Sequence, residues 1–287
     1  MKSLTRKFFV FAYTLAFSLL LGSSCASAHI LRVTDGKIVP FSEFIDDLKT
    51  VRVIFLGELH DDFAHHQAQL QIIRALKEDG IKIAIGLEMF RSDDQTYLDH
   101  WVAGDMTLED FLPIYWRNWS FWDQYKAIYM YARDNGIPMI GLNLSRQITR
   151  QVARDGFNSL SEEQLKNLPP VRCIVDPEYR KFIERALGGP GHHSGSFNNF
   201  CEAQLLWDKV MAKNLVAYLR DHPNTTVVVL AGSGHSWKHG IPKQLKQLDA
   251  IPFRVVLPEL PGRVQEQSIS PEDADYLLLG VDQGPLH

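Results

Sequence analysis

Glutamate, histidine and glycine residues recur directly after apolar runs that have the length of buried strands. The four groups, each following one run, are Gly57-Glu58-Leu59-His60, then Glu88, then Asn143, and then Gly232-Ser233-Gly234-His235. In an open α/β sheet, ligands bind at the carboxyl ends of the strands. If the four strands are parallel neighbours, we expect these groups to converge on one crevice.

Two imidazoles and two carboxylates in one crevice would suit a divalent metal ion such as Zn, Mn, Fe or Co. In a metal-dependent hydrolase, His60, His235 and Glu88 would hold the ion, which would lower the pKa of a bound water. Glu58 would then accept the proton of that water. The alternative for each residue alone is structural, with the glutamates capping helices and the histidines bonding to backbone.

Three glycines accompany these polar residues at the strand ends. Gly57, Gly232 and Gly234 stand where the backbone must turn sharply and come close to a ligand, which a residue without a Cβ does best. Ser233 beside His235 does not indicate a serine hydrolase, because the Gly-x-Ser-x-Gly elbow is missing.

The elements that must position these groups alternate between apolar strands and helices, a pattern typical of a parallel sheet. We expect helices at Phe41–Leu48, from the capping residue Asp62 to about Lys77, within the aromatic-rich segment 93–135, and at about 198–221. Asp35-Gly36 predicts a hairpin within Ile30–Pro40. We expect strands at Val51–Leu56, Ile81–Leu87, Ile137–Leu142, Thr226–Leu230 and Phe253–Leu257, and an edge strand at Asp275–Leu279.

These elements predict one α/β domain over residues 29–287, with a mainly parallel central sheet flanked by helices, a small N-terminal hairpin and helical excursions. In the helix after Asp62, a stripe of four apolar residues is expected to face the core, and His65 and His66 are expected at the surface. The stripe consists of Phe63, Leu70, Ile73 and Leu76.

Composition and charge narrow the classes of function. The 287 residues are 45% hydrophobic and 22% charged, and 30 basic side chains stand against 34 acidic ones. A disordered chain is excluded, because such a chain has fewer hydrophobic residues and a larger net charge. We expect no nucleic-acid partner, because the net charge is −4 and the body of the chain has no dense basic cluster. No Gly-Lys-Ser/Thr phosphate loop and no dinucleotide-binding glycine spacing occurs, which disfavours ATP and NAD.

Residues 1–28 are typical of a signal peptide, because Lys2, Arg6 and Lys7 precede an uncharged, largely apolar run from Phe8 to Leu21. Such a run would rise only about 21 Å as a helix, short of the roughly 30 Å hydrocarbon core of a membrane. The small residues 26–28 favour cleavage before His29, and a degenerate lipobox makes lipid attachment at Cys25 the alternative. We therefore expect an exported protein of the periplasm or a membrane-anchored lipoprotein, with no other contact to the membrane.

Export would place Cys173 and Cys201 in an oxidising compartment, where an even number of cysteines favours a disulfide. Two buried, inert thiols are the alternative. The segment between them contains Gly188-Gly189-Pro190-Gly191-His192-His193-Ser194-Gly195, a composition that predicts a loop.

Four motifs in chain order resemble the ChaN-like haem-binding uptake family of bacterial exported proteins and lipoproteins, within the TIKI superfamily. The resemblance runs from about Phe41 to the end of the chain. The motifs are Val53-Ile54-Phe55-Leu56-Gly57-Glu58-Leu59-His60-Asp61-Asp62, Gly86-Leu87-Glu88-Met89-Phe90, Trp207-Asp208-Lys209-Val210-Met211-Ala212, and Ala231-Gly232-Ser233-Gly234-His235 with Gly240-Ile241-Pro242.

This resemblance implies a haem-binding role in iron acquisition, in a family whose members pair two haems across a homodimer with tyrosine as an iron ligand. Tyr179, followed by His192 and His193, is the candidate haem-binding set, because tyrosinate suits ferric haem. The alternative for Tyr179 is a half-exposed helix residue. The superfamily also has two Gly-x-x-His motifs and a glutamate, which match Gly57/His60, Gly232/His235 and Glu88, and some of its members are metal-dependent proteases or esterases.

The sequence thus leads to an exported, homodimeric haem-binding protein of haem or iron uptake. The alternative is a metal-dependent hydrolase that uses the histidines and glutamates. A third hypothesis, an interaction module of the cell envelope, rests on an aromatic segment that would otherwise be core or a subunit contact. This segment contains Tyr115, Trp116, Trp119, Phe121, Trp122, Tyr125, Tyr129 and Tyr131.

Overall fold

The central strands are apolar runs buried on both faces of one sheet. The computed structural model describes residues 28–186 and 197–287. In β3 (Val53–Glu58), Ile54 and Leu56 face one hydrophobic core, whereas Val53 and Phe55 face the core on the other side. Successive side chains of a strand point to opposite faces, so a strand covered by helices on both sides must be apolar throughout.

The described residues form eight strands in one sheet of order β2-β1-β8-β7-β3-β6-β4-β5. The pairs β3–β6, β6–β4 and β4–β5 are parallel, so the four strands that carry the polar groups are neighbours. The predicted fold class, a single α/β domain with a mainly parallel sheet, is confirmed. The other strands are β1 (His29–Arg32), β2 (Lys37–Val39), β4 (Ile83–Arg91), β5 (Met139–Asn143), β6 (Thr226–Gly232), β7 (Phe253–Pro258) and β8 (Tyr276–Leu279).

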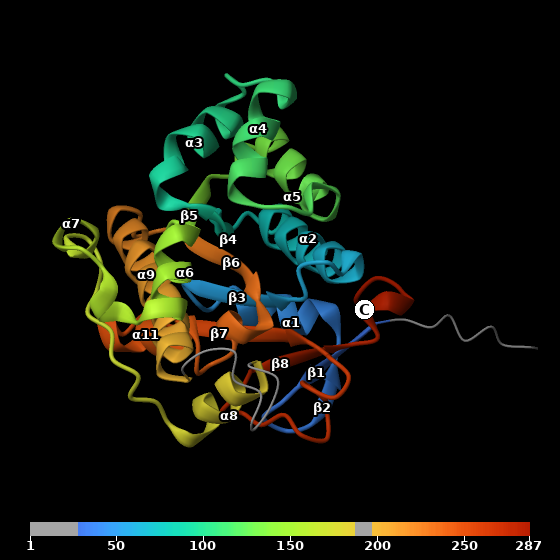
Figure 1. Cartoon of the computed structure of the whole chain (residues 1–287). Helices are drawn as coiled ribbons and strands as arrows, with labels where there is room; N and C mark the ends of the chain where they lie inside the picture. The colour runs from blue at the N-terminus through green and yellow to red at the C-terminus, as the bar shows by residue number, and fades with distance from the viewer. Residues whose placement is uncertain (1–27, 187–196) are drawn as a thin grey trace, which may run out of the picture.

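Helices cover both faces of the sheet, and a separate helical group stands at one end of it (Figure 1). The first core includes α1 (Phe41–Leu48) and α2 (Phe63–Glu78), and the second includes α9 (Phe197–Asp221) and α11 (Ile241–Leu248). The group at the end, near β4 and β5, consists of α3 (Gln95–Ala103), α4 (Leu108–Asn118) and α5 (Trp122–Asp134). The remaining helices are α6 (Arg146–Asp155), α7 (Glu162–Leu165), α8 (Pro177–Ala186) and α10 (Ser233–Ser236), with short 3₁₀ turns at Ser92–Asp94, Phe157–Ser159 and Val281–Gln283.

Local sequence signals account for several element boundaries. The side chain of Asp62 accepts hydrogen bonds from the backbone N–H groups of Ala64 and His65, and so caps α2 as predicted. Strands β1 and β2 form the predicted antiparallel hairpin, in which Gly36 has a φ of 66° that favours glycine.

Two expectations about the sheet and its helices were wrong. The last strand, β8, is not an edge strand, because it pairs with β1 on one side and β7 on the other. Phe63 is the first residue of α2 and is 55% exposed, so it does not face the core as the other residues of the predicted stripe do.

The aromatic segment is mostly core. Tyr115, Tyr125 and Tyr129 are fully buried in the cluster that α3, α4 and α5 form with the sheet, whereas Trp116 and Phe121 are exposed. Among the helices of the described residues, none is long and apolar enough to cross a membrane. The predicted signal peptide with Cys25, and the pair His192 and His193, lie outside the described residues.

Candidate functional site

The four predicted side chains meet at the carboxyl ends of β3, β4 and β6. Glu58 is the last residue of β3 and His60 lies just after it, Glu88 is within β4, and His235 is on α10, which follows β6 directly. His60 Nε2 lies 3.9 Å from Glu88 Oε1, and His235 Nε2 lies 3.7 Å from the same oxygen. Asn143, at the end of β5, holds this arrangement by donating to the backbone oxygen of Glu88 at 2.7 Å.

Each histidine is paired with its own carboxylate on the side away from Glu88. His60 Nδ1 lies 2.7 Å from Glu58 Oε1, and His235 Nδ1 lies 2.7 Å from Asp208 Oδ1. A carboxylate on one ring nitrogen fixes the orientation of an imidazole and makes its other nitrogen more basic. The site is therefore a symmetric set of two histidine–carboxylate pairs that face a shared glutamate.

Glu58 is the most heavily bonded group of the site. Its side chain is completely buried, Gln69 Nε2 donates to Oε2 at 2.7 Å, and the Tyr125 hydroxyl donates to Oε1. Burial favours the neutral acid, but the bond from His60 and the nearby His66 ring, 3.5 Å away, outweigh it and lower the pKa of Glu58. Glu58 is therefore ionised, and its hydrogen bonds fix the orientation of its side chain.

Gly232 allows the close packing at the centre of the site. Its backbone N–H donates to Glu88 Oε2 at 2.7 Å, and a Cβ there would lie 3.1 Å from His60 Nε2. The other two predicted glycines come close to the protein's own side chains, since a Cβ on Gly57 would meet Leu257 and one on Gly234 would meet the Phe182 ring. At Gly57 and Gly234 the close approach is to protein atoms and not to a ligand, and Gly57 lies within β3 and not at a sharp turn.

Two tryptophans and a tyrosine enclose the histidines. The Trp119 ring packs edge-on against His60 at 4.9 Å between centroids, and Trp207 packs in the same way against His235 at 5.5 Å. Beyond His235, the Tyr179 hydroxyl donates to Asp208 Oδ2 at 2.9 Å. The His60 side chain is 30% exposed and that of His235 only 11%, so solvent reaches the site mainly at His60.

His235 carries a positive charge in this setting. Burial opposes protonation, but Glu88 and Asp208 outweigh it and raise the pKa of His235 to about 9. Burial likewise opposes protonation of His60, and Glu88 and Glu58 overcome it and raise its pKa too. Asp208 has its pKa raised by burial, against the opposing effect of His235 and Tyr179.

A raised pKa of His235 predicts that stability falls with rising pH. The stabilisation is complete below the ordinary histidine value near 6.5 and is lost as the pH rises through about 9. From this shift we expect the free energy of unfolding to fall by about 2 kcal/mol between about pH 6 and 8, measured by urea denaturation. The double variant His235→Gln/Asp208→Asn removes the pair without leaving an unpaired carboxylate. If this variant shows the same decrease, His235 is not the group responsible.

Two histidines predicted at the surface are buried. His65 is 4% exposed and accepts a bond at Nδ1 from the backbone N–H of Leu59 at 3.0 Å, and burial lowers its pKa. His66 is 1% exposed and lies against the Tyr125 ring, with centroids 4.1 Å apart. The prediction failed because the start of α2 is covered by α5, which the sequence of α2 alone does not reveal.

Asp208, Tyr125 and Gln69 belong to the site but were not predicted as site residues. The sequence contains a signal that could have identified Asp208. This residue falls at helical spacing among apolar residues of α9, namely Cys201, Leu205, Ala212 and Leu215. A carboxylate on an apolar stripe is rarely buried without a partner. Gln69 gives a similar but weaker signal, since it stands one helical turn before the apolar residue Ile73 in α2.

The metal and disulfide predictions have different outcomes. Within residues 28–186 and 197–287, no group of three or more histidine, cysteine, aspartate or glutamate side chains is arranged to hold a metal ion. Cys173 and Cys201 form a disulfide with a Cα–Cα distance of 5.6 Å, which ties the segment before α8 to the start of α9.

Tyr179 is not the half-exposed residue of the alternative hypothesis, because it is only 1% exposed. Burial and the neighbouring Asp208 raise its pKa well above the usual tyrosine value. The phenol is therefore neutral and bonded inside the protein, and iron ligation by Tyr179 stays a prediction that requires the bond to Asp208 to break.

Comparison with known structures supports the fold. A structure of ChaN from Campylobacter jejuni, described as binding haem cofacially, matches with a TM-score of 0.70 and 24% identity, covering 88% of this chain and 96% of that one. An erythromycin esterase, the EreC H289N mutant in its open conformation, matches with a TM-score of 0.51 and 15% identity, covering 88% and 97%. Both likenesses concern the fold alone.

Sequence comparison gives one distant relative and a family. The Arabidopsis thaliana protein RETICULATA-RELATED 5, chloroplastic, is 28% identical over 211 residues, which are 66% of this chain but only 28% of that protein's length. The family model described as "Haem-binding uptake, Tiki superfamily, ChaN" matches residues 44–245, which include both histidine–carboxylate pairs, Glu88 and Tyr179. The chain therefore belongs to the ChaN family of haem-binding uptake proteins in the Tiki superfamily.

Proposed function

We propose that the protein binds haem and takes part in haem or iron uptake as an exported, homodimeric protein of the cell envelope. The observation that carries this proposal is the family match over residues 44–245. The fold similarity to ChaN from Campylobacter jejuni supports it. Export follows from the predicted signal peptide, with cleavage before His29 or lipid attachment at Cys25.

The surroundings of Tyr179 show whether this residue could bind the iron of a haem. A tyrosine ligand must lose its proton to bind ferric iron strongly, and its oxygen must face open space. Tyr179 meets neither condition in this conformation, since its hydroxyl is buried and donates to Asp208. In this conformation Tyr179 does not fit as an iron ligand, and a conformational change of α8 would be needed to expose it.

Titration of the purified protein with ferric haem tests the proposal. We expect a saturable shift of the Soret band, and the proposal fails if haem binds no better than to an unrelated protein with apolar surface. The variant Tyr179→Phe locates the ligand. Loss of the phenolate charge-transfer band would show that α8 opens on binding, and an unchanged spectrum would direct the search to His192 and His193.

A metal-dependent hydrolase stays the alternative prediction. The feature in its favour is that the Nε2 atoms of His60 and His235 both face Glu88 Oε1, while their Nδ1 atoms are held by Glu58 and Asp208. Carboxylates hold metal-binding histidines in this way. The separations of 3.9 and 3.7 Å nevertheless describe residues that contact one another, and not a preformed site for an ion.

A further inference from the structure

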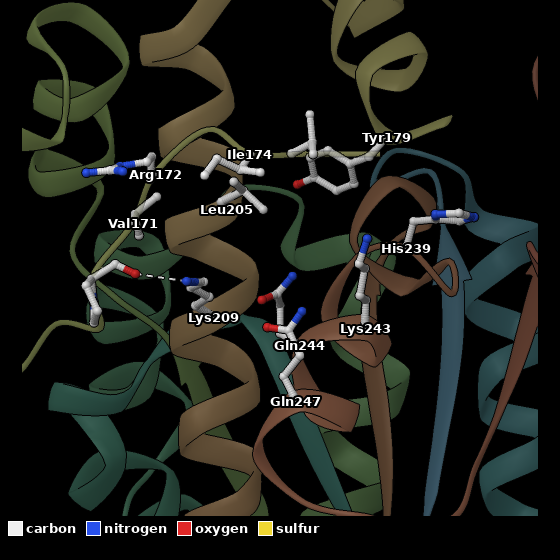
Figure 2. A pocket seen from close by; sticks show the side chains of 12 residues that line it. Val171, Arg172, Ile174, Tyr179, Leu205, Lys209, His239, Lys243, Gln244 and Gln247 are labelled. Atoms are coloured by element: carbon white, nitrogen blue, oxygen red, sulfur yellow. Dashed lines mark hydrogen bonds between the residues drawn. The ribbon is translucent and has the colours of Figure 1, made fainter. Parts of the chain in front are cut away.

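A cavity outside the set of histidine–carboxylate pairs has Tyr179 in its lining. It has a volume of about 460 Å³ and lies between the segment 170–179, α9 and α11 (Figure 2). Cavities of a few hundred Å³ are typical sites for small organic ligands. Its lining consists of Pro170, Val171, Arg172, Ile174, Val175, Tyr179, Leu205, Lys209, His239, Lys243, Gln244 and Gln247.

The lining combines an aliphatic wall with positive charge. Val171, Val175 and Leu205 supply buried or half-buried apolar surface, and Ile174 extends it although its side chain is 78% exposed. Three lining residues are basic, and no lining residue is acidic, in a chain whose net charge is −4. An apolar wall next to cations suits a ligand that has an apolar body and a negatively charged end.

The cations keep donors free for a ligand. An ammonium group has three N–H donors, and Lys209 uses one on the backbone oxygen of Pro170 at 2.8 Å. Lys243 is paired with Asp176, which is outside the lining and also bonds to His239, so the charge of Lys243 is balanced while two of its donors stay free. Arg172 is exposed at the edge and has no ion-pair partner among the residues that the structure describes.

Gln244 gives the independent indication of a ligand. It is 4% exposed, and its side-chain amide has no hydrogen-bond partner within the described parts of the chain. Figure 2 shows this amide beside Gln247, between Lys209 and Lys243. The amide atoms are not among the enclosed polar atoms that lack a partner, so the Gln244 amide is open to the cavity. It can therefore bond to a ligand that enters the cavity.

We propose that this cavity binds the carboxylate end of an apolar ligand. Lys209 and Gln244 would donate to the two carboxylate oxygens, Lys243 would offer a further N–H donor, and the apolar body would pack on Val171, Ile174 and Leu205. Such a carboxylate has two sources, a free aliphatic acid or the propionate side chains of a haem. The inference rests on the cavity alone, so it stands whether or not the protein binds haem.

Calorimetric titration of the full chain with decanoate, with decanol as the neutral comparison, tests the proposal. We expect decanoate to bind at least tenfold more tightly than decanol, and Lys209→Met and Gln244→Met each to weaken decanoate binding at least tenfold. Lys213→Met is the matched control, because Lys213 donates to the backbone oxygen of Asn167 at 2.8 Å one turn further along α9 but does not line the cavity. This control should bind decanoate as the unchanged protein does.

A second measurement keeps the result interpretable if binding is lost through misfolding. Because the Gln244 amide makes no hydrogen bond within the described residues and is open to the cavity, Gln244→Met should leave the Tm of the ligand-free protein nearly unchanged. If the Tm falls strongly, the comparison of decanoate with decanol on the unchanged protein decides. Failure of decanoate to bind the unchanged protein, or equal affinities for decanoate and decanol, would overturn the proposal. Competition with haem separates the sources: displacement of decanoate by haem indicates the propionates, and simultaneous binding indicates a free acid.

Discussion

Replacing Cys173 and Cys201 together with alanine should lower the free energy of unfolding by about 3 to 4 kcal/mol. The disulfide joins residues 28 positions apart, and a crosslink of that span removes a corresponding amount of chain entropy from the unfolded state. It also connects the segment that lines the cavity to α9, which carries Asp208. Urea denaturation of the two proteins gives the difference directly.

Reduction of the unchanged protein is the control for this prediction. A reducing agent should lower its stability to nearly the level of the double variant and should leave that variant unaffected. Limited proteolysis should then cut first between residues 170 and 186, because the crosslink no longer restrains this segment. A loss of less than about 1 kcal/mol would contradict the loop-closure argument.

Replacing Glu58 with alanine should have an effect of similar size, a loss of about 3 to 5 kcal/mol. The carboxylate accepts from Tyr125 and Gln69 and is paired with His60, and all of these contacts are buried or half-buried. Its removal leaves donors without an acceptor in the protein interior, which costs more than the pair itself contributes. Thermal and urea unfolding measure the change.

Glu43→Ala is the matched control for Glu58→Ala. Glu43 also pairs with a cation, Arg32 at 2.6 Å, but its side chain is 53% exposed. Exposed ion pairs contribute at most about 1 kcal/mol, so this variant should be almost as stable as the unchanged protein. Glu58→Gln should lie between the two, because the amide keeps the shape and one acceptor. Equal effects of Glu43→Ala and Glu58→Ala would show that the Glu58 contacts are not needed for stability.

The sequence predicted the sheet well because its strands carry a strong signal. Runs such as Thr226–Gly232 are apolar throughout, which is required of a strand covered on both faces. The expected strand ends were too early, since Glu58 and Glu88 lie within β3 and β4 and not after them. Their convergence was still predicted correctly, because it depends only on parallel neighbouring strands.

The partners of the predicted residues were harder to foresee. Tyr125 reaches Glu58 because α5 packs over α2, and Asp208 reaches His235 because α9 packs against β5 and α11. Both contacts join residues far apart in the chain, and the spacing within either helix does not specify how the helices pack. The same reason explains why His66 and Tyr179 were expected to be more exposed than they are.

The position of β8 has a consequence for the order in which the sheet is completed. The N-terminal hairpin reaches the sheet only through β8, which is inserted between β1 and β7. Until residues 276–279 are in place, β1 has no strand of the main sheet to pair with and β7 has an unpaired side. Chains that are cut short or folded only in part thus present open strand edges, which are prone to aggregation.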